Sequence, residues 1–233
     1  MTKKILSLIP ARAGSKRLLQ KNMTVLGGRP LIAWTIEASL NSKYITKTVV
    51  SSDSKEILKI AKEYGADFLK RPGLLANDTA SSESVVAHAL ESIEEKFNYI
   101  VLLQPTSPLR KTEDIDNSFE KLFRENVTAL ISVCETDNKI LKAFKENEKG
   151  FLEGLSNNKY PFMRRQDLPK TYMSNGAIYI VKVSDFLKNN SFYTDRTISY
   201  VMHGDSNLDI DTKDDLKKAE NCINQKNNKV IFN

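Results

Sequence analysis

Residues 4–11 read KILSLIPA, an apolar stretch that leads directly into the cationic loop sequence ARAGSKR. An apolar stretch of this length is typical of a buried strand and is too short for a helix. The pattern returns at 46–52 (TKTVVSS) and 99–103 (YIVLL), each followed by a polar loop and then a helical pattern. Strands that alternate with helices predict a mostly parallel sheet with helices on both faces, joined by right-handed crossovers. We therefore expect an α/β fold.

The remaining elements follow from periodicity and capping signals. Helices are expected at 30–40, 56–64, 81–93, 112–123 and 212–223. Further strands are expected at 128–133, 176–183 and 198–202. Serines just before two of these helices, Ser54 and Ser81 or Ser82, are typical N-caps, and Gly65 is a typical helix stop.

Regular alternation stops between residues 135 and 174, where the sequence is polar and rich in Lys and Asn. The few apolar residues of this segment cannot form a core of their own. We predict that it is an arm inserted in the α/β domain, which residues 1–134 and 175–226 then form. Residues 227–233 are expected to be a frayed tail.

Composition limits the class of protein. Of 233 residues, 40% are hydrophobic and 27% charged, which excludes a disordered or fibrous chain. No apolar run approaches the ~20 residues of a membrane helix, and the first apolar stretch breaks at Pro10 and Arg12, so no signal peptide is expected. Cys134 and Cys222 are far apart, which favours a reduced, cytoplasmic setting. The net charge of +6 suits nucleic acid or an anionic small molecule.

The loop after the first predicted strand is the strongest candidate for binding chemistry. Residues 11–22 contain four cations, a glycine and a serine. Backbone N–H groups of such a loop can surround a polyphosphate while Lys and Arg neutralise its charge. The loop matches neither the P-loop nor the dinucleotide motif. A solvated basic loop is the alternative interpretation.

Two acidic residues late in the chain, Asp209 and Asp211, are separated by one residue. In an extended chain such residues point to the same side, so the two carboxylates can converge. Together with phosphate oxygens, convergent carboxylates form a suitable Mg²⁺ site. The alternative is that Asp211 caps the following helix while Asp209 lies in solvent.

Seven short segments, taken together and in order, resemble the acylneuraminate cytidylyltransferases, the bacterial CMP-sialic acid synthetases. They are 9–16 (IPARAGSK) with 21–22, 52–53, 71–72, 80–82, 103–110 (LQPTSPLR), 175–179 (NGAIY) and 209–211 (DID). The resemblance implies a nucleotidyltransferase fold, CTP as donor, a nine-carbon sugar acid as acceptor, and a role in surface polysaccharide synthesis. It also implies a homodimer formed through residues 135–174, with no membrane partner.

The resemblance assigns roles to individual residues by position. The expected nucleotide-binding residues are Ala11, Arg12, Ser15, Asn22, Arg71, Ala80, Ser81 and Ser82. The expected catalytic residues are Arg12, Lys16, Lys21 and Asp211. The expected sugar-binding residues are Gln104, Lys142, Arg165, Asn175, Tyr179, Phe192 and Tyr193. The expected metal ligands are Asp209 and Asp211, with Mg²⁺ as cofactor and Mn²⁺ as a substitute.

The sequence departs from the family pattern at two places. Leu19-Gln20 stands where family members usually have Leu-Pro, and Met173-Ser174 stands where many have Arg-Pro. The second departure removes a cation near the expected acceptor site. The acceptor can therefore also be legionaminate, pseudaminate or 3-deoxy-manno-octulosonate.

Two alternatives come from other functional classes. A nucleic-acid-binding protein would suit the positive charge, but the basic residues gather at strand ends and along helix faces, and we expect no nucleic-acid partner. A non-catalytic nucleotide-binding regulator would not need both aspartates and all the loop cations.

Overall fold

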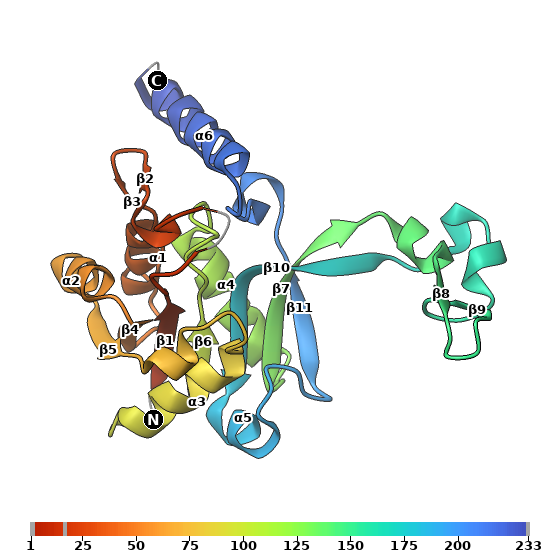
Figure 1. Ribbon diagram of the computed structural model, residues 1–233, viewed down its shortest axis with the longest axis horizontal. Helices are drawn as coiled ribbons and strands as arrows, with labels where there is room; N and C mark the ends of the chain where they lie inside the picture. Colours follow the sequence, from red (N-terminus) through yellow and green to blue (C-terminus); the bar gives the residue numbers. More distant parts are fainter. Residues whose placement is uncertain (1–2, 16–17, 232–233) are drawn as a thin grey trace.

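The computed structural model of the chain describes residues 3–15 and 18–231, and its centre is a seven-stranded sheet of order β11-β7-β10-β6-β1-β4-β5 (Figure 1). The strands are β1 (Ile5–Pro10), β4 (Lys47–Ser52), β5 (Asp67–Lys70), β6 (Tyr99–Leu102), β7 (Ala129–Thr136), β10 (Thr171–Lys182) and β11 (Thr197–Val201). All neighbouring pairs are parallel except those of β10, which runs antiparallel to β6 and β7. The predicted mostly parallel α/β sheet is confirmed.

Helices cover both faces of this sheet. They are α1 (Leu31–Leu40), α2 (Lys55–Glu63), α3 (Ser82–Ser92), α4 (Thr112–Arg124) and α5 (Val183–Asn189), whereas α6 (Lys213–Ile231) packs in a separate apolar cluster with Leu26 and Leu31 (Figure 1). Ile5 and Ile9 of β1 share a core with α1, α2 and α4, whereas the alternate residues Leu6 and Leu8 share one with α3 and α5. Because successive side chains of a strand point to opposite faces, the two helix groups form separate layers. Within the described residues, no helix has both the length and the apolar character needed to span a membrane.

Local sequence signals set where helices begin and end. The Ser54 and Ser81 hydroxyls accept hydrogen bonds from the N–H groups of Ile57 (3.3 Å) and Ser84 (3.1 Å). These bonds satisfy N–H groups that have no partner inside the helix, so both serines are N-caps. After α2 the chain turns at Gly65, whose φ of +85° is accessible to glycine at little cost.

Two elements near the end of the chain differ from the prediction. Residue Val183 begins α5, although the apolar pattern places it in the preceding strand. The last helix, α6, continues to Ile231, eight residues beyond the predicted end at 223, and the frayed tail stays a prediction. No Gly or Pro interrupts the sequence from 213 to 231, and nothing in it stops the helix. Residues 232–233 lie outside the described part of the chain.

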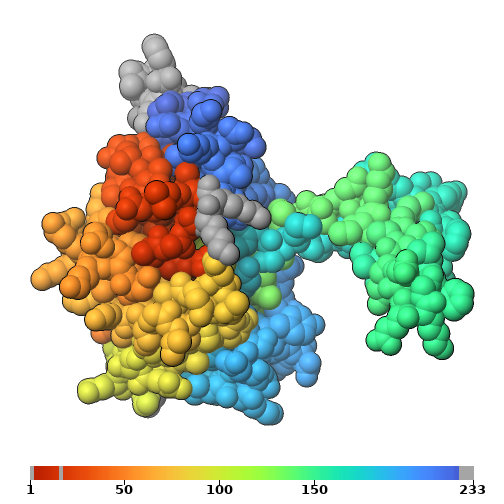
Figure 2. Space-filling model, viewed as in Figure 1, coloured from red at the N-terminus to blue at the C-terminus, as the bar shows by residue number. Residues whose placement is uncertain are grey.

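The arm, residues 135–174, projects from the body as a separate lobe (Figure 2). Strands β7 and β10 run out of the body together as its stem, with Thr136 paired to Thr171. Beyond the stem lie several 3-10 turns and a small hairpin of β8 (Phe144–Glu146) and β9 (Leu152–Gly154). The sequence did not predict that the flanking strands would continue into this segment.

Candidate active site

The carboxyl ends of β1, β4, β5 and β6 meet at one edge of the sheet because these strands are parallel. The loops that follow β1, β5 and β6 enclose a first pocket of about 200 Å³. A second pocket, of about 260 Å³, adjoins it, and Ser82 and Gln104 border both. The predicted residues that line the first pocket are Arg12, Ser15, Lys21, Asn22, Arg71, Ala80, Ser81, Ser82 and Gln104.

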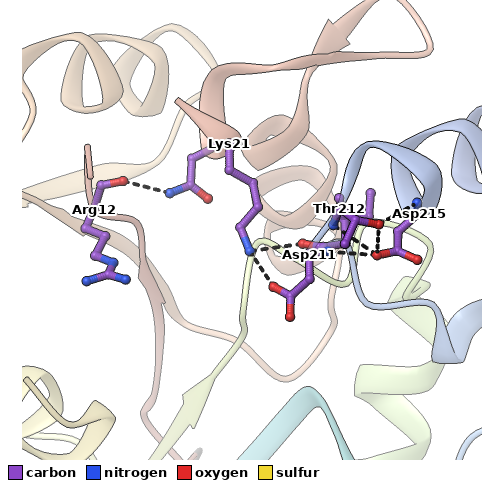
Figure 3. A network of polar contacts seen from close by, with 7 residues as sticks. Arg12, Lys21, Asp211, Thr212 and Asp215 are labelled. Atoms are coloured by element: carbon purple, nitrogen blue, oxygen red, sulfur yellow. Dashed lines mark hydrogen bonds and ion pairs between the residues drawn. The ribbon is translucent and has the colours of Figure 1, made fainter. Parts of the chain in front are cut away.

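The loop after β1 is held in place by side-chain hydrogen bonds. The Asn22 amide donates to the Arg12 carbonyl oxygen (3.0 Å; Figure 3), and the Ala13 N–H donates to Asp53 Oδ1 (3.0 Å). Ala11, predicted to bind the nucleotide, is fully buried and is not among the residues that line the pocket. Lys16 lies outside the described residues.

Arg12 faces an acidic residue that the sequence did not single out. Its Nη1 atom lies 2.8 Å from Asp78 Oδ1, and both side chains are partly exposed. Asp78 belongs to the loop between β5 and α3, the segment that also supplies Arg71 and Ala80 to the pocket. A cation expected to bind an anionic group is therefore paired with a carboxylate.

Arg71 is a buried cation in the lining of the first pocket. Burial lowers the pKa of its guanidinium, and the opposite charge of Asp53 works against that effect. Within the described part of the chain, its Nε and Nη2 atoms have no hydrogen-bond partner. Buried donors without partners are costly, so this guanidinium is suited to a ligand that supplies acceptors.

Lys21 joins the first loop to the segment before α6. Its Nζ atom lies 2.9 Å from Asp211 Oδ1 and donates to the Ile210 carbonyl oxygen at 3.0 Å (Figure 3). Desolvation raises the pKa of Asp209, the Thr106 side chain lowers it by a hydrogen bond, and the charge of Asp211 raises it further. The two carboxylates thus lie close enough to repel each other.

The cap of α6 is Thr212. Its Oγ1 atom accepts from the Asp215 N–H (3.2 Å), while Asp215 Oδ2 accepts from the Thr212 N–H (3.0 Å; Figure 3). This reciprocal pair is a capping box. The alternative interpretation of Asp211 as the helix cap is therefore wrong, and Asp211 lies beside Lys21.

The donor set of this region can be tested against a metal ion. In the described residues, no group of three or more His, Cys, Asp or Glu side chains is placed to hold one. Asp209 and Asp211 supply hard oxygen donors of the kind that Mg²⁺ prefers, and Mg²⁺ normally takes its remaining ligands from water and phosphate. The pair therefore fits Mg²⁺ only together with an anionic ligand.

The second pocket contains four of the predicted sugar-binding residues, Gln104, Tyr179, Phe192 and Tyr193. The Tyr179 and Phe192 rings lie 5.6 Å apart between centroids, and the Tyr179 hydroxyl is 2.7 Å from Ser174 Oγ. An aromatic wall with a few polar groups is typical of a site for a small organic ligand.

Three predicted sugar-binding residues are not in this pocket. Asn175 is buried in β10, where its Oδ1 accepts from Ser132 Oγ (2.6 Å) and its Nδ2 donates to Asn207 Oδ1 (2.9 Å). These hydrogen bonds support the strand, and the sugar-binding role of Asn175 stays a prediction. Lys142 and Arg165 lie in the arm, and neither borders the two pockets.

Sequence reasoning also missed residues that complete the site. Asp78 pairs with Arg12, Thr106 bonds Asp209, and Ser191 borders the second pocket. Thr106 lies inside the LQPTSPLR segment, so the sequence did indicate that this part of the chain belongs to the site. No pattern in the sequence indicated that Asp78 would face Arg12.

A model of the cytidylyltransferase family matches residues 6–233. The N-acylneuraminate cytidylyltransferase of Escherichia coli O18:K1:H7 is 37% identical over 99% of this chain and 55% of its own length. The chain thus spans about half the length of the first curated relatives it matches. The pseudaminic acid cytidylyltransferase of Campylobacter jejuni subsp. jejuni serotype O:2 is 33% identical over 93% of this chain and 95% of its own length.

Among solved structures, a CMP:2-keto-3-deoxy-manno-octonic acid synthetase complexed with CTP superposes with a TM-score of 0.72 at 17% identity. The match covers 96% of this chain and 99% of that one. At this identity the likeness concerns the fold.

Replacing Asp78 by Asn should strengthen the binding of inorganic tripolyphosphate to the first pocket. The carboxylate competes with an anion for Arg12, and a partly exposed ion pair is worth up to about 1 kcal/mol, or roughly fivefold in affinity. Isothermal titration calorimetry measures the change. Glu120→Gln, which removes the exposed Lys43–Glu120 ion pair (2.7 Å) elsewhere, is the control and should leave the affinity unchanged. Equal affinities of Asp78→Asn and the unaltered chain would contradict the prediction.

Proposed function

The chain belongs to the cytidylyltransferase family, and on this premise we propose that it transfers CMP from CTP to the anomeric hydroxyl of a nine-carbon sugar acid. The observation that carries the proposal is the pair of adjoining pockets. One is cationic and contains a buried arginine with unpaired donors, and the other has aromatic and amide walls. A donor nucleotide and an acceptor bound side by side would meet at Gln104 and Ser82.

We propose that the first pocket binds CTP. Arg12 and Lys21 would neutralise the triphosphate, and Asn22 would contact the ribose. Arg71 and the segment 80–82 would bind the edge of the base. Cytosine presents acceptors at O2 and N3 that suit the donors of Arg71, whereas uracil has an N–H at N3. The catalytic role of Lys16 stays a prediction, because this residue lies outside the described part of the chain.

The second pocket would hold the acceptor. Tyr179, Phe192 and Tyr193 offer apolar faces and hydroxyls, and the Gln104 amide can bind hydroxyl or carboxylate groups of a sugar acid. N-acetylneuraminate is the acceptor that we propose, since the Escherichia coli relative is named an N-acylneuraminate cytidylyltransferase and N-acetylneuraminate belongs to that class of sugar acids. Pseudaminate is the alternative that the name of the Campylobacter relative supports.

In the proposed reaction the anomeric oxygen attacks the α-phosphorus of CTP and gives its proton to Asp209, to Asp211 or to a water molecule beside them. The bond from the α-phosphorus to the bridging oxygen breaks, and pyrophosphate leaves. Because negative charge grows on the leaving group, Arg12 and Lys21, which line the first pocket, would stabilise it. No covalent intermediate is needed, so the residues of the chain act by positioning and by charge.

We propose that Asp209 and Asp211 hold Mg²⁺ together with the phosphates of CTP. When bound, the ion would polarise the α-phosphate and offset the charge of the triphosphate. The contact between Lys21 and Asp211 keeps the first loop beside these carboxylates. Mn²⁺ is the expected substitute. The cytoplasm is the proposed location, because two distant cysteines favour a reducing compartment.

Purified protein should release pyrophosphate from CTP when a sugar acid is added. We expect CTP to be preferred to UTP by about a hundredfold or more, because unpaired buried donors reject a mismatched base. The assay compares the four nucleoside triphosphates with N-acetylneuraminate, legionaminate, pseudaminate and 3-deoxy-manno-octulosonate, and omits the acceptor as a control. Equal turnover of UTP would refute the role of Arg71, and no turnover with any acceptor would refute the proposed reaction.

Asp209→Ala and Asp211→Ala should each abolish most activity and leave the melting temperature of the metal-free protein nearly unchanged. Thr212→Ala is the matched control, because loss of the cap costs about 1 kcal/mol of stability but removes no metal ligand. Rates and melting curves across a magnesium titration separate the two effects. An aspartate variant with wild-type turnover at saturating magnesium would show that this aspartate is not a necessary ligand.

We also propose that two copies of the chain form a homodimer through the arm. The arm of each copy would then bring Lys142 and Arg165 to the second pocket of the other. Exposed Phe151, Leu152 and Phe162 lie on the arm, and Phe162 is 83% exposed. An apolar surface of this kind is typical of an interface.

Light scattering should therefore give the mass of a dimer for the full chain. Phe162→Asp should shift the mass to that of a monomer and reduce turnover. Leu74→Asp is the matched control, since Leu74 is 85% exposed on the body and its replacement should leave the dimer intact. A monomeric full chain would be incompatible with the proposal.

A further inference from the structure

We propose that Gly176 and Arg110 are positioning residues that hold the Gln104 side chain at the wall between the two pockets, and thereby set the affinity for the acceptor. The inference deepens the proposed function and rests on it. Gln104 borders both pockets and is half-buried. Its conformation therefore affects how a ligand in the second pocket lies relative to one in the first.

Gly176 leaves the space that the Gln104 amide occupies. A Cβ atom built at this glycine would lie 2.8 Å from Gln104 Oε1, a distance at which the amide must move. The glycine has a φ of +75° and lies where the pairing of β10 with β7 shifts register, between Ser174 and Tyr179. Such an irregularity redirects a strand locally and is common beside functional sites.

Arg110 ties the same two segments together from inside the protein. Its Nη1 atom donates to the Gln104 carbonyl oxygen (3.2 Å) and to the Ala177 carbonyl oxygen (2.8 Å). One guanidinium thus links the loop after β6 to the residue that follows Gly176. Complete burial lowers the pKa of Arg110 to about 9, so the group is still charged at neutral pH. Charged donors make stronger hydrogen bonds than neutral ones.

Asn175 supports the irregular part of β10 on its other side. Its Oδ1 atom accepts from Ser132 Oγ (2.6 Å) and from the Ala177 N–H (3.2 Å). The backbone at Gly176 is therefore fixed by neighbours on both sides.

Within residues 3–15 and 18–231, no partner binds the Gln104 side-chain amide. Among the described residues its side chain makes no hydrogen bond, although its backbone is fixed by Arg110. Three features together describe a preorganised binding group: a backbone fixed by a buried charge, an amide whose space exists because residue 176 has no Cβ atom, and a position on the border of both pockets.

Steady-state kinetics of Gly176→Ala test the inference. We expect the KM for the sugar acid to rise about tenfold, the effect of losing one hydrogen bond, while the KM for CTP changes less than about twofold. Gly28→Ala is the matched control, because Gly28 also has a positive φ (+83°), but a Cβ atom added there would have no neighbour within 4 Å. The control should leave both constants unchanged.

A double variant separates positioning from a general structural effect. If Gly176 acts through Gln104, then Gly176→Ala should add nothing to the acceptor KM of Gln104→Ala. Arg110→Lys, which keeps the charge and loses the fork of donors, should also raise the acceptor KM. Additive effects of the two alanine variants, or equal constants for Gly176→Ala and Gly28→Ala, would overturn the inference. Absence of turnover by the unaltered chain would refute the proposed function instead.

Discussion

Parallel pairing of β1 with β4 on one side and with β6 on the other is the interaction on which the rest of the molecule depends. It brings the loops after three strands to one edge although they are separated by dozens of residues. Backbone hydrogen bonds fix the strands, and the strand ends in turn fix where each loop begins. The loops therefore need little regular structure of their own to stay side by side. Three contacts then complete the arrangement: Ala13 with Asp53, Asn22 with the Arg12 carbonyl, and Lys21 with Asp211.

The two pockets differ in the interactions that fix their lining side chains. Cations of the first are balanced by acids of the same chain, as in the pair of Arg12 with Asp78. The walls of the second depend on ring packing, with Tyr179 against Phe192 and Phe192 against Phe186 of α5. Ion pairs therefore position side chains of the first pocket, and ring packing positions those of the second. Gln104, Ser191 and the tyrosine hydroxyls add polar groups to the otherwise apolar walls of the second pocket.

The sequence was sufficient to predict the alternating elements, because caps such as Ser54 and apolar strands such as 99–103 act locally. It also indicated most residues of the first pocket, which follow strand ends. Prediction from the sequence failed for residues whose role depends on partners far away in the chain. Asn175 bonds Ser132 and Asn207, partners that no local pattern reveals. Asp211 could be read as a cap or as a ligand until Thr212 proved to be the cap. Lys142 and Arg165 lie in the arm, so their predicted role depends on a second copy of the chain.

Helix α6 begins two residues after Asp211 and is a rod of about 28 Å, at 1.5 Å per residue. Its first turns are anchored by Ala219 and Ile223, which pack in one apolar cluster with Leu26 and Leu31. A small tilt of the rod about that anchor would rotate the segment that carries Asp209 and Asp211, because only Thr212 separates Asp211 from the helix. The relative position of the Asp209 and Asp211 carboxylates thus depends on how the apolar cluster packs against α6. Substitutions in that apolar cluster would alter the distance between oxygens that they never touch.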